Sequence, residues 1–235
     1  MTRRRWIADE VSDHRAALTG EHARHLSQVL RAQVGQEFDI STGAEVRRGR
    51  ISGIHPDRVE FELGEVVAHS AGSAITLALS IFKFDRMEWA IEKCTELGVA
   101  RIVPVIAGRT ESHLSTAAAK RVERWRRIVH QAAEQSRRIS PPEISAPVKF
   151  DDLVAMTADA RIVLAEAEDD LLLKDALRQG AGAVLLAFGP EGGWKPQELA
   201  AFRDAGWAAA SLGNTILRAE TAAIAAVAIA ASILQ

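Results

Sequence analysis

The sequence has only one cysteine, Cys94, among its 235 residues. A single thiol excludes an intrachain disulfide, and a chain without disulfides is typical of a reducing compartment, so we expect a cytoplasmic protein. Histidine is also sparse, because the seven histidines are scattered and none stands at a spacing typical of metal ligands. The sequence therefore predicts neither a disulfide-bonded scaffold nor a metal site.

The sequence also has no large excess of positive or negative charge. The chain carries 29 Lys and Arg against 31 Asp and Glu, a formal net charge of -2 at pH 7. Such a chain has no strongly basic body, so contact with nucleic acid has to come from local patches. The most basic stretch, residues 120–138, carries seven Lys and Arg against two Glu, which indicates either a phosphate-binding surface or an ordinary solvated helix face.

Long hydrophobic runs are almost absent. No apolar segment follows Arg3, Arg4 and Arg5, so these residues do not predict a signal peptide. The one long apolar segment, residues 219–234, is rich in alanine and contains Glu220 near its start. Because alanine gains too little from lipid to insert into a membrane, we expect a buried or subunit-interface helix and no membrane partner.

Short segments, mostly of β type, fill residues 1–72. A helix is expected over residues 19–31, where Thr19 can form the N-cap and apolar residues recur at helical spacing. Strands are expected after it, over residues 37–41, 45–54 and 58–67. The pattern predicts a small β-rich domain over residues 1–70, followed by a linker at residues 68–72.

Beyond residue 72, strands alternate with helices. We expect strands over residues 74–82, 101–106, 161–165, 183–188 and 208–212, and helices over residues 85–97, 116–138 and 171–178, from near residue 196, and from residue 219. This alternation predicts an α/β domain over residues 74–235 with a parallel sheet covered on both faces. Cys94 falls on the apolar face of its helix, so we expect a structural rather than a catalytic role.

Two of these strands end at glycine turns that carry charged residues. The first turn is Gly189-Pro190-Glu191-Gly192-Gly193, and the second begins at Gly213 and leads to Arg218 and Glu220. Ligands of open α/β sheets bind where loops leave the carboxyl ends of parallel strands. Two such turns side by side therefore indicate one shared pocket.

The first turn differs from common nucleotide-binding loops. It has neither the Lys-Ser/Thr ending of a P-loop nor the three-glycine spacing of a dinucleotide fold, and Glu191 would repel a pyrophosphate. Glycines for close backbone approach, together with a carboxylate, favour an adenosine-like or positively charged ligand. S-adenosylmethionine, a sulfonium, has both properties, and Ile216 and Leu217 could enclose its adenine. Two tight turns without a ligand are the alternative.

Both turn segments resemble the two signature motifs of RsmE-type methyltransferases of the SPOUT class. They read Phe188-Gly189-Pro190-Glu191-Gly192-Gly193-Trp194 and Leu212-Gly213-Asn214-Thr215-Ile216-Leu217-Arg218-Ala219-Glu220-Thr221-Ala222. Three further segments agree in order and spacing, at residues 25–31, 92–98 and 132–138. The resemblance covers nearly the whole chain, but the family commonly has Pro-Arg where this chain has Asn214-Thr215.

The resemblance implies an S-adenosylmethionine-dependent enzyme that methylates N3 of a specific uridine in 16S ribosomal RNA of the small ribosomal subunit. It also implies a PUA-like, RNA-binding β-barrel over residues 1–70 and a SPOUT methyltransferase domain over residues 74–235. The C-terminal part of the second domain would form a trefoil knot. Members of the family work as homodimers with knot-region helices at the interface, which suits an apolar helix at residues 219–234.

The chemistry of methyl transfer to a protonated uridine N3 suggests roles for individual residues. We expect Arg218 to bind the phosphate or uracil oxygen of the target, and Glu220 to act as base or to orient Arg218; a carboxylate that satisfies backbone donors at a helix start is the alternative for Glu220. Glu191 would either neutralise part of the sulfonium charge or fix its turn. Cofactor contacts are expected from Leu164, Ala165, Glu166, Phe188, Gly189, Pro190, Glu191, Gly192, Gly193, Leu212, Gly213, Ile216, Leu217 and Ala222. RNA contacts are expected from Arg3, Arg4, Arg5, His25, Arg31, Lys83, Arg137 and Arg138.

Three other functions fit part of the pattern. A SPOUT methyltransferase acting on transfer RNA or on another base would differ only in its substrate. An RNA-binding assembly factor would have a vestigial pocket, although the intact glycines together with Arg218 and Glu220 argue against this. A nucleotide-binding regulator would bind ATP and not S-adenosylmethionine.

Overall fold

The computed structural model describes residues 5–69, 75–165, 171–177 and 182–234. The chain divides into two compact units, one made of Met1–Ala71 with Ala133–Pro141, and the other made of Gly72–Ala132 with Pro142–Gln235. Each unit has buried hydrophobic clusters of its own. A search of the described helices for one long and apolar enough to cross a membrane finds none.

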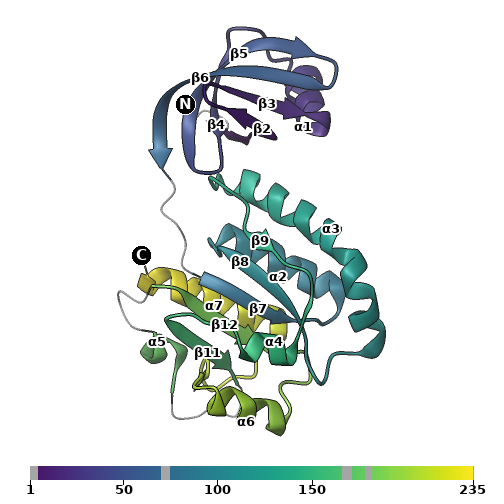
Figure 1. The fold of residues 1–235 in the computed structure, drawn as a ribbon, viewed down its shortest axis with the longest axis vertical. Coiled ribbons are helices and arrows are strands. Elements are labelled where there is room, and N and C mark those ends of the chain that lie inside the picture. The colour runs from purple at the N-terminus through teal and green to yellow at the C-terminus, as the bar shows by residue number, and fades with distance from the viewer. Residues whose placement is uncertain (1–4, 70–74, 166–170, 178–181, 235) are drawn as a thin grey trace. The chain divides into compact units, whose positions relative to one another are not determined.

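The first unit is built on a six-stranded sheet in the order β1-β4-β5-β6-β3-β2. All neighbours are antiparallel except β1 and β4, and the sheet curls into a half-barrel drawn in purple and blue in Figure 1. Val59, Phe61 and Leu63 alternate toward its core, as their spacing predicts. The strands are β1 (Arg5–Ile7), β2 (Glu10–Ser12), β3 (Arg15–Thr19), β4 (Glu37–Ser41), β5 (Glu45–His55) and β6 (Arg58–His69).

Residues 19–31 do not form the single α-helix that their apolar spacing predicts, so this prediction is wrong. The chain forms a short α-helix, α1 (Gly20–Arg24), which continues as a π-helix, η1 (His25–Val29). A π turn contains more residues than an α turn, so later side chains rotate away from the face that an α-helix would bury. Leu26 is accordingly buried, whereas Val29 is 67% exposed.

The second unit contains a parallel sheet in the order β10-β8-β7-β12-β11-β13, with β9 paired to β8. This confirms the parallel sheet expected from the alternating pattern. The trefoil knot implied by the resemblance stays a prediction. The strands are β7 (Ile75–Ser80), β8 (Arg101–Ile106), β9 (Glu143–Ile144), β10 (Val148–Lys149), β11 (Ala160–Leu164), β12 (Val184–Phe188) and β13 (Ala208–Ala210).

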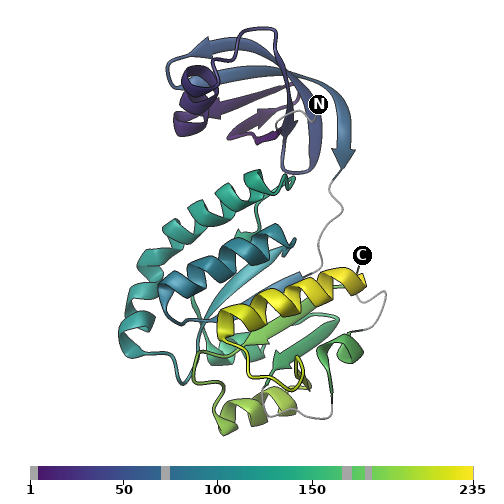
Figure 2. The same ribbon diagram turned by 180° about the vertical axis from the view of Figure 1, so that it is seen from behind.

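Helices cover both faces of this sheet, and Figure 2 shows α2, α3 and α7 side by side across one of them. Side chains of β7 and β12 alternate between the two layers, so that Leu186 faces α2 and α7 while Leu185 faces α6. One face carries α2 (Phe84–Glu96), α3 (Ser112–Gln135), α5 (Leu173–Ala176) and α7 (Ala219–Leu234), and the other carries α4 (Phe150–Val154) and α6 (Pro196–Asp204).

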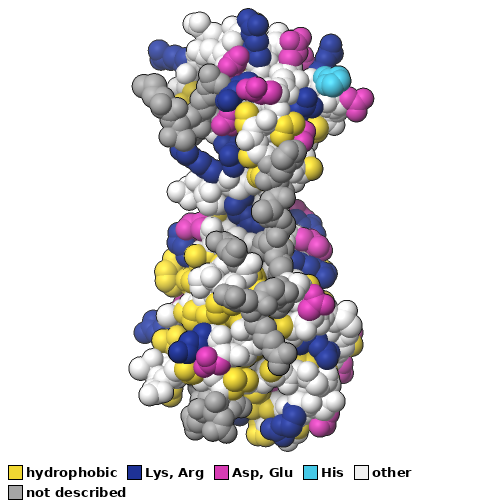
Figure 3. Space-filling model, turned by 90° about the vertical axis from the view of Figure 1, so that its left-hand side faces the viewer, with side chains coloured by type: hydrophobic (Ala, Val, Ile, Leu, Met, Phe, Trp, Pro, Cys, Tyr) yellow, Lys and Arg dark blue, Asp and Glu magenta, His cyan; other side chains and the backbone are white. Residues whose placement is uncertain are grey.

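The surface agrees with the balanced composition. On the face drawn in Figure 3, Lys and Arg side chains of the described residues are interspersed with Asp and Glu, and these residues form no extended basic area there. Contact with a polyanion therefore depends on smaller groups of arginines, as the near-zero net charge predicts.

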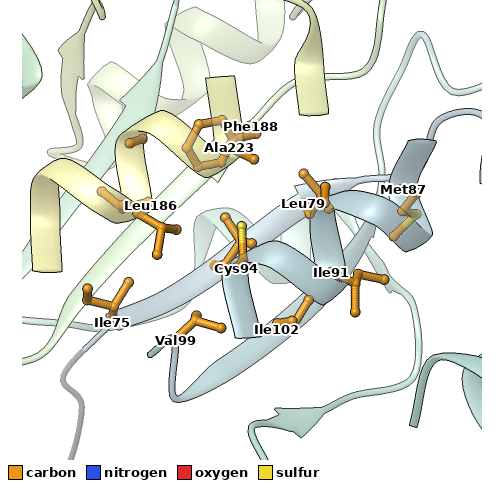
Figure 4. Close-up of a cluster of buried hydrophobic side chains, with 14 of the residues drawn as sticks. Ile75, Leu79, Met87, Ile91, Cys94, Val99, Ile102, Leu186, Phe188 and Ala223 are labelled. Carbon is orange, nitrogen blue, oxygen red and sulfur yellow. The ribbon is translucent and has the colours of Figure 1, made fainter. Parts of the chain in front are cut away.

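Cys94 lies in the apolar layer between α2 and the sheet, surrounded in Figure 4 by Ile75, Val99 and Leu186. The side chain is fully buried, and this burial raises the pKa of its thiol to about 12. Because only the thiolate is nucleophilic, the environment of Cys94 supports a structural role.

We expect the Cys94 thiol to be inert toward a thiol-specific reagent such as dithionitrobenzoate in the folded protein at neutral pH. The pKa of about 12 leaves only about one thiol in 10⁵ ionised at pH 7, so the native rate should be at least ~100-fold below that of the unfolded chain. Reaction in denaturant, with Cys94→Ala as a blank, gives the reference rate. Equal rates in the folded and unfolded states would contradict a buried thiol.

Candidate functional site

The two glycine turns leave the same edge of the parallel sheet. At this edge Leu164, the last residue of β11, is paired on one side with Phe188 of β12 and on the other with Ala210 of β13. Neighbouring strands are about 4.8 Å apart, so the strands that lead into the two turns are separated by about 10 Å. The end of β11 lies between them.

The first turn is tightly closed. The N–H of Gly193 donates to the carbonyl oxygen of Pro190 at 2.7 Å. A Cβ at Gly189 would lie 3.2 Å from the backbone of Gly193 and Trp194, so a side chain at residue 189 would crowd the returning chain. The indole of Trp194 then donates to the carbonyl of Leu164 at 3.1 Å, which ties this turn to the end of β11.

The second turn is more open. Gly213 has φ of +116°, a conformation that side chains rarely adopt, and residues 213–216 are exposed. Ile216 is 82% exposed, although it is a large apolar residue. An apolar side chain at the mouth of a turn offers a surface on which a flat aromatic ligand can lie. The turn ends where the N–H of Ala222 donates to the carbonyl of Arg218 in the first turn of α7.

Arg86, in the first turn of α2, connects the two turn regions. Its Nη1 lies 3.2 Å from Oε1 of Glu191 in the first turn, and its Nε lies 3.9 Å from Oε1 of Glu220 at the start of α7. Glu220 is buried, and its Oε2 has no hydrogen-bond partner among the residues that the structure describes. The first turn and the start of α7 therefore meet at the guanidinium of Arg86.

Glu198 of α6 fastens the other side of the first turn. One of its oxygens accepts the N–H of Gly108, after β8, and the other accepts the N–H of Lys195, both at 2.7 Å. Arg109, next in the same loop, donates from Nη1 to the carbonyl of Gly192. The loop after β8 and the first turn are thus held together by a buried carboxylate and a guanidinium.

Comparison with known proteins identifies relatives of this chain. Residues 69–231 match the model of an RNA methyltransferase domain, and residues 18–64 match that of an RNA methyltransferase PUA domain. A ribosomal RNA small subunit methyltransferase E from Synechocystis is 30% identical over 220 residues, which cover 91% of this chain and 72% of the relative. The chain belongs to the ribosomal RNA small subunit methyltransferase E family.

Two further members support this assignment. The methyltransferase E of Bacillus subtilis is 30% identical over 220 residues, covering 88% of this chain and 85% of the relative. A crystal structure of a methyltransferase E from Neisseria gonorrhoeae, bound to S-adenosyl methionine, is 31% identical with a TM-score of 0.86. That match covers 99% of this chain and 98% of the solved chain.

The two residues expected to act in catalysis lie at the start of α7 in this family member. Arg218 is exposed, and its side chain makes no hydrogen bond or ion pair with the described part of the chain. The buried carboxylate of Glu220 pairs with Arg86 rather than with Arg218. Within the described residues, no backbone N–H donates to Oε2 of Glu220. This observation disfavours the alternative that Glu220 only satisfies backbone donors at the start of the helix.

The residues expected to contact the cofactor surround the same sheet edge. Phe188 is buried, Ala165 and Ala222 are half-buried, and the carbonyl of Leu164 is already engaged by Trp194. The contact of Glu191 with Arg86 favours the interpretation that this carboxylate fixes its turn. Glu166 lies outside the described residues. The other expected contacts belong to the two turns: Gly189, Pro190, Gly192, Gly193, Leu212, Gly213, Ile216 and Leu217.

Several residues expected to contact RNA come together in the first unit. Arg5 of β1 donates to the carbonyl of Arg137, and the next residue, Trp6, has its ring centroid 5.7 Å from that of His25. Three segments that are distant in sequence thus meet at β1. Arg3 and Arg4 lie outside the described residues.

The remaining basic candidates differ in their surroundings. Arg31 and Arg137 have φ of +52° and +58°, a strained conformation for residues with a side chain, and both are exposed. Arg138 is half-buried, and burial lowers the pKa of its guanidinium. Lys83 is exposed in the second unit, immediately before α2.

Sequence reasoning missed the side chains that hold the first turn, namely Arg86, Arg109 and Glu198. The loops at the carboxyl ends of β7 and β8 were the available signal, because ligand sites of parallel sheets draw on several such loops. Arg86 and Arg109 lie just beyond these two strand ends. Their partners are 83 to 134 positions away, and local patterns carry no information on contacts at that separation.

We expect Glu198→Ala to destabilise the protein by about 2–4 kcal/mol, because it leaves the N–H groups of Gly108 and Lys195 without their carboxylate acceptor. Urea denaturation at neutral pH measures this change in the free energy of unfolding. Glu198→Gln, which keeps one acceptor oxygen, should lose less than half as much. A Glu198→Ala variant as stable as the parent protein would show that the carboxylate does not hold the turn.

Proposed function

We propose that this protein transfers the methyl group of S-adenosylmethionine to N3 of a uridine in 16S ribosomal RNA of the small ribosomal subunit. The observation that carries this proposal is the pair of glycine turns flanking the end of β11, in a chain of the methyltransferase E family. The N. gonorrhoeae relative, bound to S-adenosyl methionine and matched along 99% of this chain, supports the choice of methyl donor.

The residues at the sheet edge suit this donor. Its adenine ring is flat, and the edge offers the exposed apolar side chain of Ile216, on which such a ring can lie. Gly189 and Gly213 let the backbone approach a ligand where side chains would intervene. We assign cofactor binding to residues 164–166, 188–193, 212–213 and 216–217, and to Ala222.

When bound, S-adenosylmethionine supplies an electrophilic methyl group bonded to a positively charged sulfur. Uridine N3 carries a proton at neutral pH, so the protein has to remove this proton or stabilise the resulting anion. In our proposal the N3–H proton passes to the carboxylate of Glu220. N3 then forms a bond to the methyl carbon as the carbon–sulfur bond breaks, and the released electron pair stays on sulfur.

Arg218 complements Glu220 in this scheme. Its side chain is exposed and is not engaged by described residues, so it is available to a phosphate or to the uracil oxygen on which negative charge develops. Positioning of the two reactants accounts for most of the rate enhancement in such an in-line displacement. The target base has to leave its stack to reach the turns, as in other base-modifying enzymes.

Residues 1–70 are the proposed RNA-binding domain, and residues 74–235 the proposed methyltransferase domain. Residues 133–141 of the second range belong to the first compact unit and contribute Arg137 and Arg138 to it. Arg5, His25 and Arg137 belong to segments that meet at β1, and among them Arg137 is exposed, so that its guanidinium is accessible to a phosphate. We also propose a cytoplasmic homodimer with α7 at its interface, because this helix combines small alanine side chains with partly exposed isoleucines.

We expect Arg218→Ala to lower kcat by about 10²–10³-fold, the usual effect of removing one charged contact to developing negative charge. Mass spectrometry of the methylated uridine in small-subunit RNA, taken from a strain that lacks the modification, measures activity. Calorimetry should show S-adenosylmethionine affinity within a few-fold of the parent value, with Arg218→Lys as the conservative control. Loss of cofactor affinity would assign Arg218 to the cofactor, and a parent protein without activity would contradict the proposed function.

We expect Arg137→Glu together with Arg138→Glu to weaken RNA binding and to flatten its dependence on salt. Each phosphate contact removed should reduce the slope of log K against log salt by about 0.7 to 0.9. Filter binding at several salt concentrations measures this slope. Because Arg138 is half-buried, Arg137→Glu alone should show most of the effect, with exposed Arg203 of α6 changed to Glu as control. An unchanged slope would remove Arg137 and Arg138 from the interface.

A further inference from the structure

Arg86 lies between two carboxylates that belong to different parts of the site. Its Nη1 is 3.2 Å from Glu191 in the first turn, and its Nε is 3.9 Å from Glu220 in the first turn of α7. A guanidinium is planar and presents its donors in fixed directions, so one arginine can hold two carboxylates in a defined relation. Arg86 therefore fixes the position of the first glycine turn relative to the start of α7.

The two carboxylates depend on Arg86 to different degrees. The side chain of Glu191 is 31% exposed, whereas that of Glu220 is 6% exposed. An exposed ion pair contributes little to stability, but a carboxylate removed from water needs a cation or donors close by. Of the cations in the described part of the chain, Arg86 is the one within 4.0 Å of Glu220.

Glu220 has one oxygen toward Arg86 and one without a partner. Oε1 faces the Nε of Arg86, while Oε2 is buried and accepts no hydrogen bond from any described residue. A buried acceptor left without a donor is unfavourable, and in native proteins such an atom calls for an explanation. A ligand that brings its own N–H to this oxygen is one such explanation.

We propose that Arg86 is the positioning residue for Glu220 in the methyl transfer, an inference that rests on the proposed function. Arg86 acts through Glu220 and does not itself touch the reacting atoms. Its guanidinium balances the buried charge and fixes Oε1, which leaves Oε2 as the acceptor for the N3–H of uridine. Through its contact with Glu191, the same guanidinium holds the first turn in a fixed position relative to the Glu220 carboxylate.

The decisive experiment measures kcat at saturating S-adenosylmethionine and RNA for Arg86→Gln, Glu220→Gln, the double variant and Arg86→Lys. If Arg86 acts through Glu220, Arg86→Gln lowers kcat by about 10²-fold, and the double variant is no slower than Glu220→Gln alone. Arg86→Lys, which keeps the charge but not the planar fork, recovers part of the rate. The exposed Arg203→Gln on α6 is the matched control and retains the parent rate.

Thermal unfolding of the same variants tests the contact without any need for activity. Arg86→Gln leaves the Glu220 carboxylate buried without its cation, and should lower the midpoint by about 2–4 °C for each kcal/mol of stability lost. Adding Glu220→Gln should restore most of that loss, because a neutral amide needs no cation. A merely structural role of Arg86 would give the unfolding result but not the non-additive kcat.

Two results would overturn the inference: an Arg86→Gln variant with the parent kcat, or losses of rate that multiply in the double variant. If the parent kcat is accompanied by a raised KM for RNA, Arg86 is an RNA-binding residue. If the parent protein yields no methylated uridine, the proposed function fails instead. The unfolding measurements still decide whether Arg86 holds Glu220, and no restoration in the double variant would refute that contact.

Discussion

The parallel register of β11 with β12 and β13 is the constraint on which the site depends. It places Leu164, Phe188 and Ala210 in one row, so that the two glycine turns leave the sheet on either side of one strand end. Parallel strands bring their carboxyl ends to the same edge, and the hydrophobic layers on both faces keep this register fixed. The turns therefore lie at the same edge of the sheet, although residues 194–212 separate them in the chain.

The two turns differ in the number of contacts that hold them and in their exposure. The first is closed by its own hydrogen bond and held from outside by Trp194, Arg109 and Glu198. The second is exposed from Gly213 to Ile216 and is fixed mainly where it joins β13 and α7. A turn held by many contacts, beside a more exposed one, suits a site with two substrates. Arg86 connects the first turn to the buried carboxylate on α7.

Much of the second unit follows from local sequence. The expected strand at residues 101–106 agrees with β8, and the helix at residues 85–97 differs from α2 by one residue at each end, because their apolar patterns fit a single period. The helix expected over residues 116–138 instead spans Ser112–Gln135, since the chain leaves the helix near Arg137. The short strands β1, β2, β9 and β10 were not expected, because two or three residues are too few to show a period.

For the candidate site, too, local sequence predicts some features, whereas others depend on contacts between distant segments. Glycines at strand ends and the resemblance to a known family located both turns, since these signals are local. The partners of Glu191, Glu198 and Glu220 come from other elements and depend on the assembled sheet. The π-helical winding after Arg24 also escaped the pattern, because the apolar spacing at residues 26, 29 and 30 fits an ordinary α-helix.

The central claim is that the two turns together bind S-adenosylmethionine, and calorimetric titration of the purified protein tests it most directly. The account predicts one binding event per chain for S-adenosylmethionine and none for ATP. It also predicts at least a tenfold loss of affinity in Gly189→Val and in Gly213→Val, while circular dichroism shows both variants folded. Absence of binding by the parent protein, or equal affinity in the two folded variants, would contradict the claim.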